Sequence, residues 1–108
     1  MNRDYSDGPT RANVDAMAGA VVLEFGTPWC GHCRAVQPLL EHALADFADT
    51  THIKVEDGSG RKLGRSFAVT LWPTLVFLLA GQEVARLVRP TQTAAIRQSL
   101  VQLHTGAK

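Results

Sequence analysis

The sequence Trp29-Cys30-Gly31-His32-Cys33 holds both cysteines of the chain, with two residues between them. An apolar run, residues 20–25, leads into this stretch, and a segment of helical periodicity, residues 34–47, leads out of it. The apolar positions that recur at helical spacing are Val36, Leu39, Leu40, Ala43, Leu44 and Phe47. The cysteines are therefore expected in the turn between a buried strand and the first turn of a helix that Pro38 kinks.

The rest of the chain alternates between helical and strand patterns. The patterns predict a helix at 11–17, strands at 51–57, 74–79 and 83–88, a short helix capped by Ser59, and a last helix after Pro90. A strand-helix-strand crossover is right-handed, so the first two strands are parallel, and the tight Ala80-Gly81 connection makes the last two antiparallel. The order predicts an α/β fold: a mixed central sheet of about four strands, with room for a short N-terminal strand and with helices on both faces.

Composition and charge narrow the class of protein. A chain of 108 residues is the size of one domain. The net charge is +1 and the basic residues are scattered, which excludes the clustered basic face of a nucleic-acid-binding protein. We expect a flexible leader at 1–8, a domain at 9–105 and a tail at 106–108. The polar start lacks a signal-peptide core, and the longest apolar run, 75–80, is too short to span a membrane. A monomer in the cytoplasm is expected, or in the periplasm only if a leader has been removed.

Three features of the turn favour the reactive thiolate form of Cys30. The cysteine stands at a helix N-terminus, where unpaired N–H groups and the helix dipole attract an anion. His32 adds a positive charge when protonated, and Cys33 can donate its S–H group. These features are expected to lower the pKa of Cys30. A thiolate with a resolving thiol two residues away is the minimum machinery of disulfide exchange.

An acidic residue, Glu24, interrupts the apolar strand just before the turn. Burial is expected to raise the pKa of this carboxyl group, because desolvation disfavours its charged form. Glu24 could then take the proton from Cys33 when that thiol attacks a mixed disulfide. Lys54, on the neighbouring strand, is a candidate partner for the carboxylate.

Other roles for the two cysteines stay open at this point. They could form a structural disulfide, although cytoplasmic proteins seldom carry one. They could hold half of a zinc or iron–sulfur site, which would need a dimer because no second ligand pair has the required spacing. Haem attachment is excluded, because Arg34 follows Cys33 where a histidine would be needed. The remaining histidines, His42, His52 and His104, are expected at the surface.

The sequence resembles the thioredoxin superfamily over residues 14–103. The turn resembles the thioredoxin active site, with the inner Gly31-His32 pair of protein disulfide isomerase domains, and Glu24 matches a buried acid that is normally Asp. Pro38 falls at the helix-kink proline, Trp72-Pro73-Thr74 matches the cis-proline loop, and Gly81 matches the hairpin glycine. The resemblance implies a thioredoxin fold, with Cys30 as the attacking thiol and Cys33 as the resolving thiol.

The resemblance also implies how a substrate binds. It implies a cis bond before Pro73 and a substrate surface made by Trp29, Gly31, Trp72, Pro73 and Thr74. Three departures from the family concern this surface: Gly26 stands in place of a usual Trp, Trp72 in place of a small or aliphatic residue, and Arg89-Pro90 in place of a groove glycine. With His32 in the turn, we expect a redox potential between the value of about −270 mV of thioredoxin and that of about −180 mV of protein disulfide isomerase.

The sequence thus predicts an enzyme, a thioredoxin-like protein-disulfide reductase or thiol-disulfide oxidoreductase. It is expected to need no metal and no cofactor beyond the redox-active pair Cys30 and Cys33. The expected partners are protein disulfides and an electron donor of the thioredoxin-reductase type. The alternative is a thioredoxin-fold binding module that docks one dedicated partner through Trp29 and Trp72, with little general reductase activity.

Overall fold

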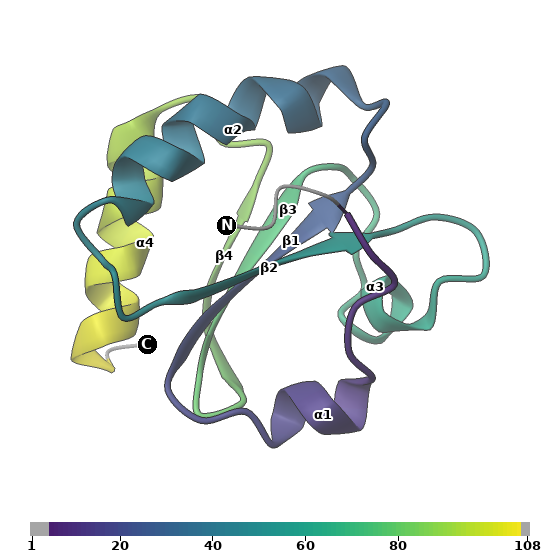
Figure 1. Ribbon diagram of the computed structural model, residues 1–108, viewed down its shortest axis with the longest axis horizontal. Coiled ribbons are helices and arrows are strands. Elements are labelled where there is room, and N and C mark those ends of the chain that lie inside the picture. Colours follow the sequence, from purple (N-terminus) through teal and green to yellow (C-terminus); the bar gives the residue numbers. More distant parts are fainter. Residues whose placement is uncertain (1–4, 107–108) are drawn as a thin grey trace.

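A computed structural model describes residues 5–106 of the chain. Its elements are, in order, α1 (Arg11–Asp15), β1 (Ala20–Gly26), α2 (Gly31–Leu44), β2 (Thr51–Glu56), α3 (Lys62–Ser66), β3 (Thr74–Leu79), β4 (Gln82–Val88) and α4 (Thr93–Thr105), as Figure 1 shows. The four strands form one sheet in the order β2-β1-β3-β4. β1 is parallel to β2 and antiparallel to β3, and β4 is antiparallel to β3, as expected. The predicted fold class is confirmed.

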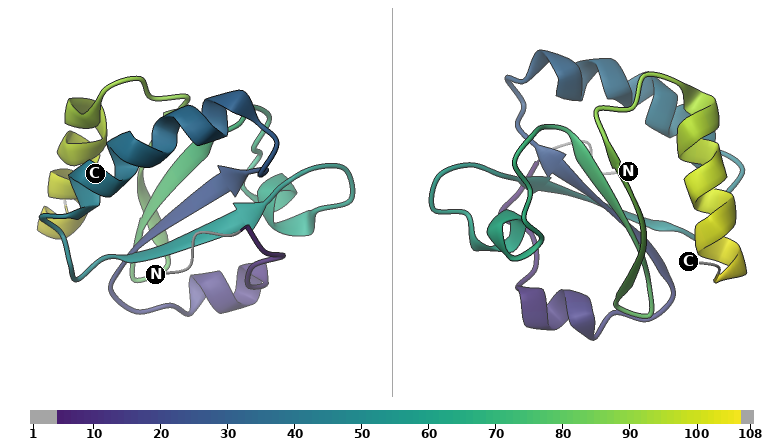
Figure 2. Two further views of the ribbon diagram at one scale, coloured as in Figure 1. Left: turned by 45° about the horizontal axis from the view of Figure 1, so that its top comes forward. Right: turned by 180° about the vertical axis from the view of Figure 1, so that it is seen from behind.

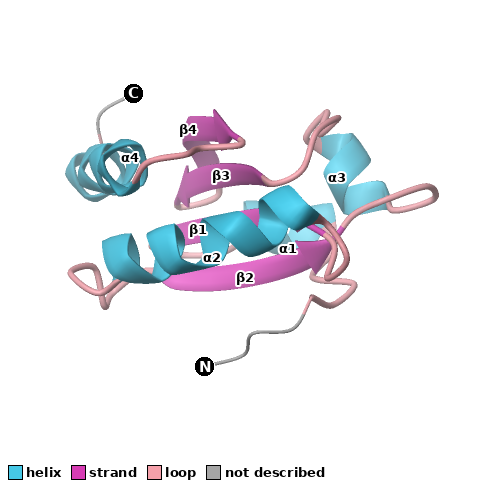
Figure 3. Ribbon diagram, turned by 90° about the horizontal axis from the view of Figure 1, so that it is seen from above, coloured by secondary structure: helices cyan, strands magenta, loops and turns pink. Residues whose placement is uncertain are grey.

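Helices cover the sheet on both faces (Figure 2). α4 lies beside α2 and next to β3 and β4 (Figure 3), and α1 and α3 pack on the other side. Within residues 5–106, none of the helices has the length and apolar character that crossing a bilayer would need.

The central strand β1 divides its side chains between these two layers. Every residue of β1 is buried. Val22 packs in the core under α2 and α4, whereas Leu23 and Phe25 pack in the core under α1 and α3. Because successive side chains of a strand point to opposite faces, Glu24 and Gly26 lie on the α2 side with Val22. The strand thus delivers a carboxylate to the layer that holds the cysteines.

The predicted cap of α3 is wrong. The N-cap residue is Arg61, which makes no side-chain capping bond, and Ser59 lies two residues earlier. Gly58 and Gly60, both with positive φ, turn the chain before the helix begins, and the Arg61 amide bonds the Gly58 carbonyl at 3.1 Å. The two glycines therefore extend the turn beyond the point at which Ser59 could serve as a cap. α1 also ends two residues earlier than expected, at Asp15.

Residues 5–8, which the sequence places in a flexible leader, contact the edge of the sheet. The Ser6 amide bonds the Lys54 carbonyl at 3.3 Å, and the Glu56 amide bonds the Ser6 carbonyl at 2.7 Å. These bonds make an isolated parallel bridge between Ser6 and Val55, in the place where a short N-terminal strand was allowed for. The first part of the predicted leader, residues 1–4, lies outside the described residues.

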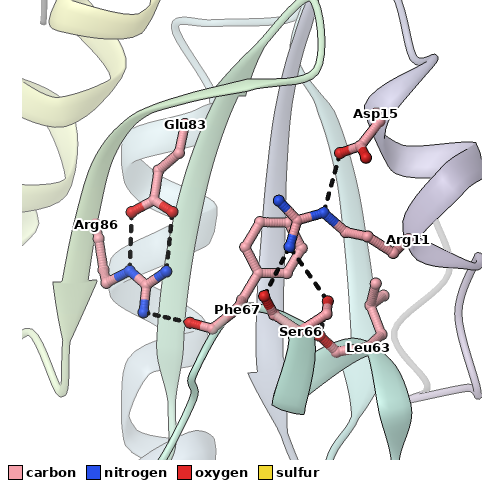
Figure 4. A network of polar contacts seen from close by, with 7 residues as sticks. All are labelled: Arg11, Asp15, Leu63, Ser66, Phe67, Glu83 and Arg86. Carbon is pink, nitrogen blue, oxygen red and sulfur yellow. Dashed lines mark hydrogen bonds and ion pairs between the residues drawn. The ribbon is translucent and has the colours of Figure 1, made fainter.

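Two arginines hold the loop after α3 in place, as Figure 4 shows. The Arg11 guanidinium lies 3.8 Å from the centroid of the Phe67 ring and donates to the Ser66 carbonyl at 2.8 Å. Arg86 donates to the Phe67 carbonyl at 2.8 Å and, through two bonds of 2.9 Å, to Glu83. α1, α3 and β4 are thereby linked on the face opposite the cysteines.

Candidate functional site

The two cysteines lie at the N-terminus of α2, as the sequence predicts. Cys30 is the N-cap residue, and its sulfur accepts a hydrogen bond of 3.2 Å from the Cys33 amide. Both thiols are free. Cys30 is partly exposed, Cys33 is 1% exposed, and Gly31 and His32 lie exposed on the first helical turn. An accessible sulfur at a helix N-terminus, backed by a buried one, suits nucleophilic attack by the first and resolution by the second.

Cys33 holds its proton tightly. Burial raises the pKa of this thiol to about 12, and the neighbouring Cys30 adds to the rise. The Thr27 amide and the Tyr5 hydroxyl oppose it as hydrogen-bond partners. At neutral pH Cys33 is therefore a thiol, and its attack on a disulfide requires a group that takes the proton away.

Glu24 is fully buried and bonded by side chains from the N-terminal segment, α2 and β2. The Tyr5 hydroxyl donates to its Oε2 at 2.5 Å, Gln37 Nε2 donates to the same oxygen at 2.7 Å, and His52 Nε2 lies 2.8 Å from Oε1. Burial raises the pKa of Glu24, but the bonds from His52, Tyr5 and Gln37 outweigh burial and bring the pKa below its ordinary value. The expected rise is thus wrong, because three donors stabilise the carboxylate.

A second set of contacts ties this carboxylate to the helix that carries the cysteines. Gln37 also donates to the Cys33 carbonyl at 2.8 Å. Lys54 donates to Gln37 Oε1 at 3.1 Å, and its ammonium lies 4.5 Å from the centroid of the Tyr5 ring. Lys54, which the sequence offers as a partner of Glu24, thus supports the site through Gln37 and the Tyr5 ring.

The loop after α3 lies against the cysteine turn. The peptide bond before Pro73 is cis, which confirms the prediction from the family resemblance. The Trp29 and Trp72 rings meet edge to face, with centroids 5.5 Å apart and an interplanar angle of 77°. Trp29 is 69% exposed. The Trp72 indole donates to Asp57 Oδ2 at 2.8 Å, and Asp57 is only 9% exposed, so a buried carboxylate sets the orientation of Trp72.

Arg89 fastens the same loop from the end of β4. Its φ of 52° lies in the left-handed region that favours glycine, which matches the family's glycine at this place. The Arg89 amide bonds the Pro73 carbonyl at 2.9 Å, and its guanidinium bonds the Trp72 carbonyl at 2.8 Å. Thr74 is buried, and its hydroxyl bonds the Leu71 carbonyl at 2.7 Å, so this side chain supports the loop instead of lining the surface.

The structure brings together most of the site residues expected from the sequence. One turn holds residues 29–33, and Trp72 and Pro73 lie beside it. A pocket of about 410 Å³ opens on the other side of the buried thiol. It is lined by Tyr5, Thr27, Pro28, Cys33, Arg34, Gln37 and Lys54. In the described part of the chain, no group of three or more His, Cys, Asp and Glu side chains could hold a metal ion.

The sequence analysis missed four contributors to the site: Tyr5, Gln37, His52 and Asp57. Two of them carried a usable signal. Gln37 stands four residues after Cys33 and therefore on the same face of the helix. His52 alternates with the apolar residues of β2, so it faces the same layer as Glu24. No local pattern in the sequence marked the other two, whose partners lie far along the chain.

Comparison with known proteins agrees with this geometry. The thioredoxin family profile matches residues 7–102. Thioredoxin 2 from Pseudomonas aeruginosa PAO1, solved in its reduced form, is 49% identical, with a TM-score of 0.87 over 99% of this chain and 100% of that one. Thioredoxin from Chlamydia pneumoniae is 35% identical over 71 residues, which are 66% of this chain and 70% of that protein.

A plant relative is longer than this chain. Thioredoxin H2-2 from Oryza sativa subsp. japonica is 32% identical over 68 residues, which are 63% of this chain. The chain spans about half the length of this relative, 51%. The profile match, the shared fold and the dithiol turn lead to one conclusion: the chain belongs to the thioredoxin family.

Proposed function

We propose that the protein reduces protein disulfides through Cys30 and Cys33. The observation that carries the proposal is the contrast between the two sulfurs: Cys30 is partly exposed at the start of α2, whereas Cys33 is buried behind it. The Cys30 thiolate attacks a substrate disulfide, forms a mixed disulfide and releases one substrate thiol. Cys33 then attacks Cys30 and releases the second substrate thiol.

Glu24 is the proposed acceptor of the Cys33 proton. Its three hydrogen bonds keep it ionised at neutral pH, so it has a vacant site for a proton. Because its pKa is lowered, the protonated form is short-lived, and the proton passes on to the departing thiolate or to water. His32, on the exposed first turn of α2, is the proposed electrostatic support of the Cys30 thiolate when its ring is protonated.

The proposed partners are proteins with an accessible disulfide and a reductase that returns the pair to the dithiol state. The substrate surface is the Trp29–Trp72 pair with the Pro73 loop and Gly31. The cytoplasm is the proposed compartment, because its reducing systems regenerate thiols. We further propose that the protein is a monomer, that no cofactor beyond the cysteine pair takes part, and that the redox potential lies between about −270 and about −180 mV.

Reduction of insulin by dithiothreitol, followed by turbidity, tests this function. The wild-type protein should accelerate precipitation, and Cys30→Ser should abolish the acceleration. Cys33→Ser should react once and then stall. Thr50→Ser, which also introduces a serine but lies far from the turn, is the control for both cysteine variants and should retain the wild-type rate. No acceleration above dithiothreitol alone would contradict a general reductase.

The exposed indole of Trp29 favours a second candidate, a binding module for one dedicated partner. A large apolar side chain that is 69% exposed beside the reactive sulfur is suited to docking. This candidate predicts poor insulin turnover together with stoichiometric capture of one protein by Cys33→Ser. It also predicts that Trp29→Ala removes the capture while both thiols stay reactive.

A further inference from the structure

Tyr5 is the one tyrosine of the chain, and it reaches into the site from the N-terminal segment. The bonds between Ser6 and β2 hold this segment at the sheet edge, and the Lys54 ammonium lies over the Tyr5 ring. The Tyr5 hydroxyl group donates to Glu24 Oε2, on the inner strand β1, at 2.5 Å. So far this hydroxyl has served to stabilise the Glu24 carboxylate and to oppose the rise of the Cys33 pKa; no part in the transfer of the proton has been assigned to it.

Gly26 makes room for the Tyr5 hydroxyl next to the resolving sulfur. A Cβ atom built on Gly26 would lie 2.5 Å from Cys33 Sγ and 2.9 Å from the Tyr5 hydroxyl oxygen. Both atoms thus occupy the space that any larger residue at this position would need. The sulfur and the hydroxyl oxygen are neighbours above the glycine, and the hydroxyl in turn touches the carboxylate.

The Tyr5 hydroxyl stays protonated in this place. Burial raises its pKa, and the Glu24 carboxylate and Cys33 raise it further. Its proton points to Glu24, because an ionised carboxylate only accepts hydrogen bonds. The lone pairs of the hydroxyl oxygen therefore remain free to accept a proton from a neighbouring donor, and Cys33 is such a donor.

We propose that Tyr5 relays the proton of Cys33 to Glu24 during the resolving step. The proposal rests on the proposed function. Cys33 gives its proton to the Tyr5 oxygen while Tyr5 gives its own proton to Glu24, so the tyrosine ends the step neutral. The Cys33 sulfur forms a bond to Cys30 Sγ, and the bond between Cys30 and the substrate sulfur breaks. The electron pair leaves with the substrate sulfur, which takes up a proton from Glu24 or water.

The charged and titratable groups around this relay come from three elements. β1 provides Glu24, α2 and its N-cap provide Cys33, Arg34 and Cys30, and β2 provides His52 and Lys54. The Tyr5 hydroxyl donates to Glu24 at 2.5 Å and is also a hydrogen-bond partner of Cys33, so it touches both ends of the proposed path. If the Tyr5 side chain only fills the space above Gly26, phenylalanine can replace it without loss of rate. If the hydroxyl carries the proton, phenylalanine cannot, so Tyr5→Phe tests the relay.

The test separates attack from resolution by mixing the reduced protein with Ellman's reagent in a stopped-flow instrument. Attack by Cys30 releases the first thionitrobenzoate at a rate that depends on reagent concentration. Attack by Cys33 releases the second at a rate that does not. Tyr5→Phe should leave the first rate within about twofold of wild type and slow the second at least about tenfold. Ser99→Ala, which removes a buried hydroxyl on α4, is the matched control and should change neither rate.

A double-mutant cycle with Glu24→Gln shows whether the two groups act in one path. If they do, Tyr5→Phe slows resolution no further once Glu24 is Gln. The solvent deuterium isotope effect on the second phase should also fall in Tyr5→Phe, a readout that a packing role would not move. The relay would be overturned if Tyr5→Phe released the second thionitrobenzoate within about twofold of the wild-type rate. It would also be overturned if the effects of Tyr5→Phe and Glu24→Gln on this rate were fully additive. If the wild-type protein itself releases only one thionitrobenzoate, the proposed dithiol function fails, which is a separate outcome.

Discussion

Replacing His52 with Phe is expected to raise the pKa of Glu24. His52 Nε2 lies 2.8 Å from Glu24 Oε1, and the His52 side chain is 14% exposed while that of Glu24 is fully buried. Because the ionised carboxylate only accepts, this nitrogen is the donor. Phe keeps a planar ring on the strand but cannot donate, so Oε1 loses its hydrogen bond from His52.

The size of the effect follows from the contact. A hydrogen bond to a charged group contributes about 1.5–3 kcal/mol, and one pKa unit corresponds to about 1.4 kcal/mol, so the pKa of Glu24 should rise by roughly 1–2 units. The bonds from Tyr5 and Gln37 remain and limit the rise. The free energy of unfolding at neutral pH should fall by a similar amount, about 1.5–3 kcal/mol.

Nuclear magnetic resonance of side-chain carbons in glutamate-labelled protein measures this titration, with Glu24→Gln to assign the signal. His42→Phe, at an exposed position of α2, is the matched control and should leave the midpoint of Glu24 in place. A midpoint that stays within about 0.3 unit of wild type in His52→Phe would show that this bond does not set the carboxylate pKa, and would refute the reasoning.

Three further predictions concern the rim, the hairpin and acid stability. Asp57→Ala frees the Trp72 indole, so KM for insulin should rise several-fold while the rate with Ellman's reagent stays unchanged; equal losses with both substrates would contradict a docking role. Gly81→Ala would place a Cβ atom 2.2 Å from a backbone carbonyl oxygen of α1, at a φ of 79°, and should lower the free energy of unfolding in urea by at least about 2 kcal/mol. Gly19→Ala is the control: its Cβ would have nothing within 4 Å, and the loss should be about 1 kcal/mol. Because the folded pKa of Glu24 is lowered, its contribution to stability is present above the ordinary carboxyl pKa and is lost as pH falls toward the folded value; the stability difference between wild type and Glu24→Gln should therefore shrink below about pH 4, and a constant difference would contradict this.

Much of the fold could be predicted from the sequence because its signals are local. The unbroken apolar run of residues 20–25 marks a strand that is covered on both faces, and β1 is such a strand. The Ala80-Gly81 turn set the antiparallel hairpin, since both residues adopt the positive φ that a two-residue connection requires. The position of the cysteines followed from the strand before them and the helix after them.

The environment of Glu24 could not be predicted in the same way. Its apolar neighbours along the strand indicated desolvation alone, whereas the groups that reverse the pKa shift come from residues 13 to 28 positions away along the chain. Tyr5 is the clearest case: a polar stretch with no periodicity indicates a leader, yet its one aromatic ring fits the space that Gly26 leaves open. Such long-range complementarity becomes visible only when the backbone has been placed.

The most direct test of the account is to find which sulfur captures a substrate. Cys33→Ser and Cys30→Ser are each incubated with oxidised insulin, and the mixed disulfides are mapped by mass spectrometry. The account predicts a stable mixed disulfide on Cys30 in Cys33→Ser and almost none on Cys33 in Cys30→Ser, because burial keeps Cys33 a thiol. Capture by Cys33 at a comparable rate would contradict the assignment of the attacking and resolving thiols.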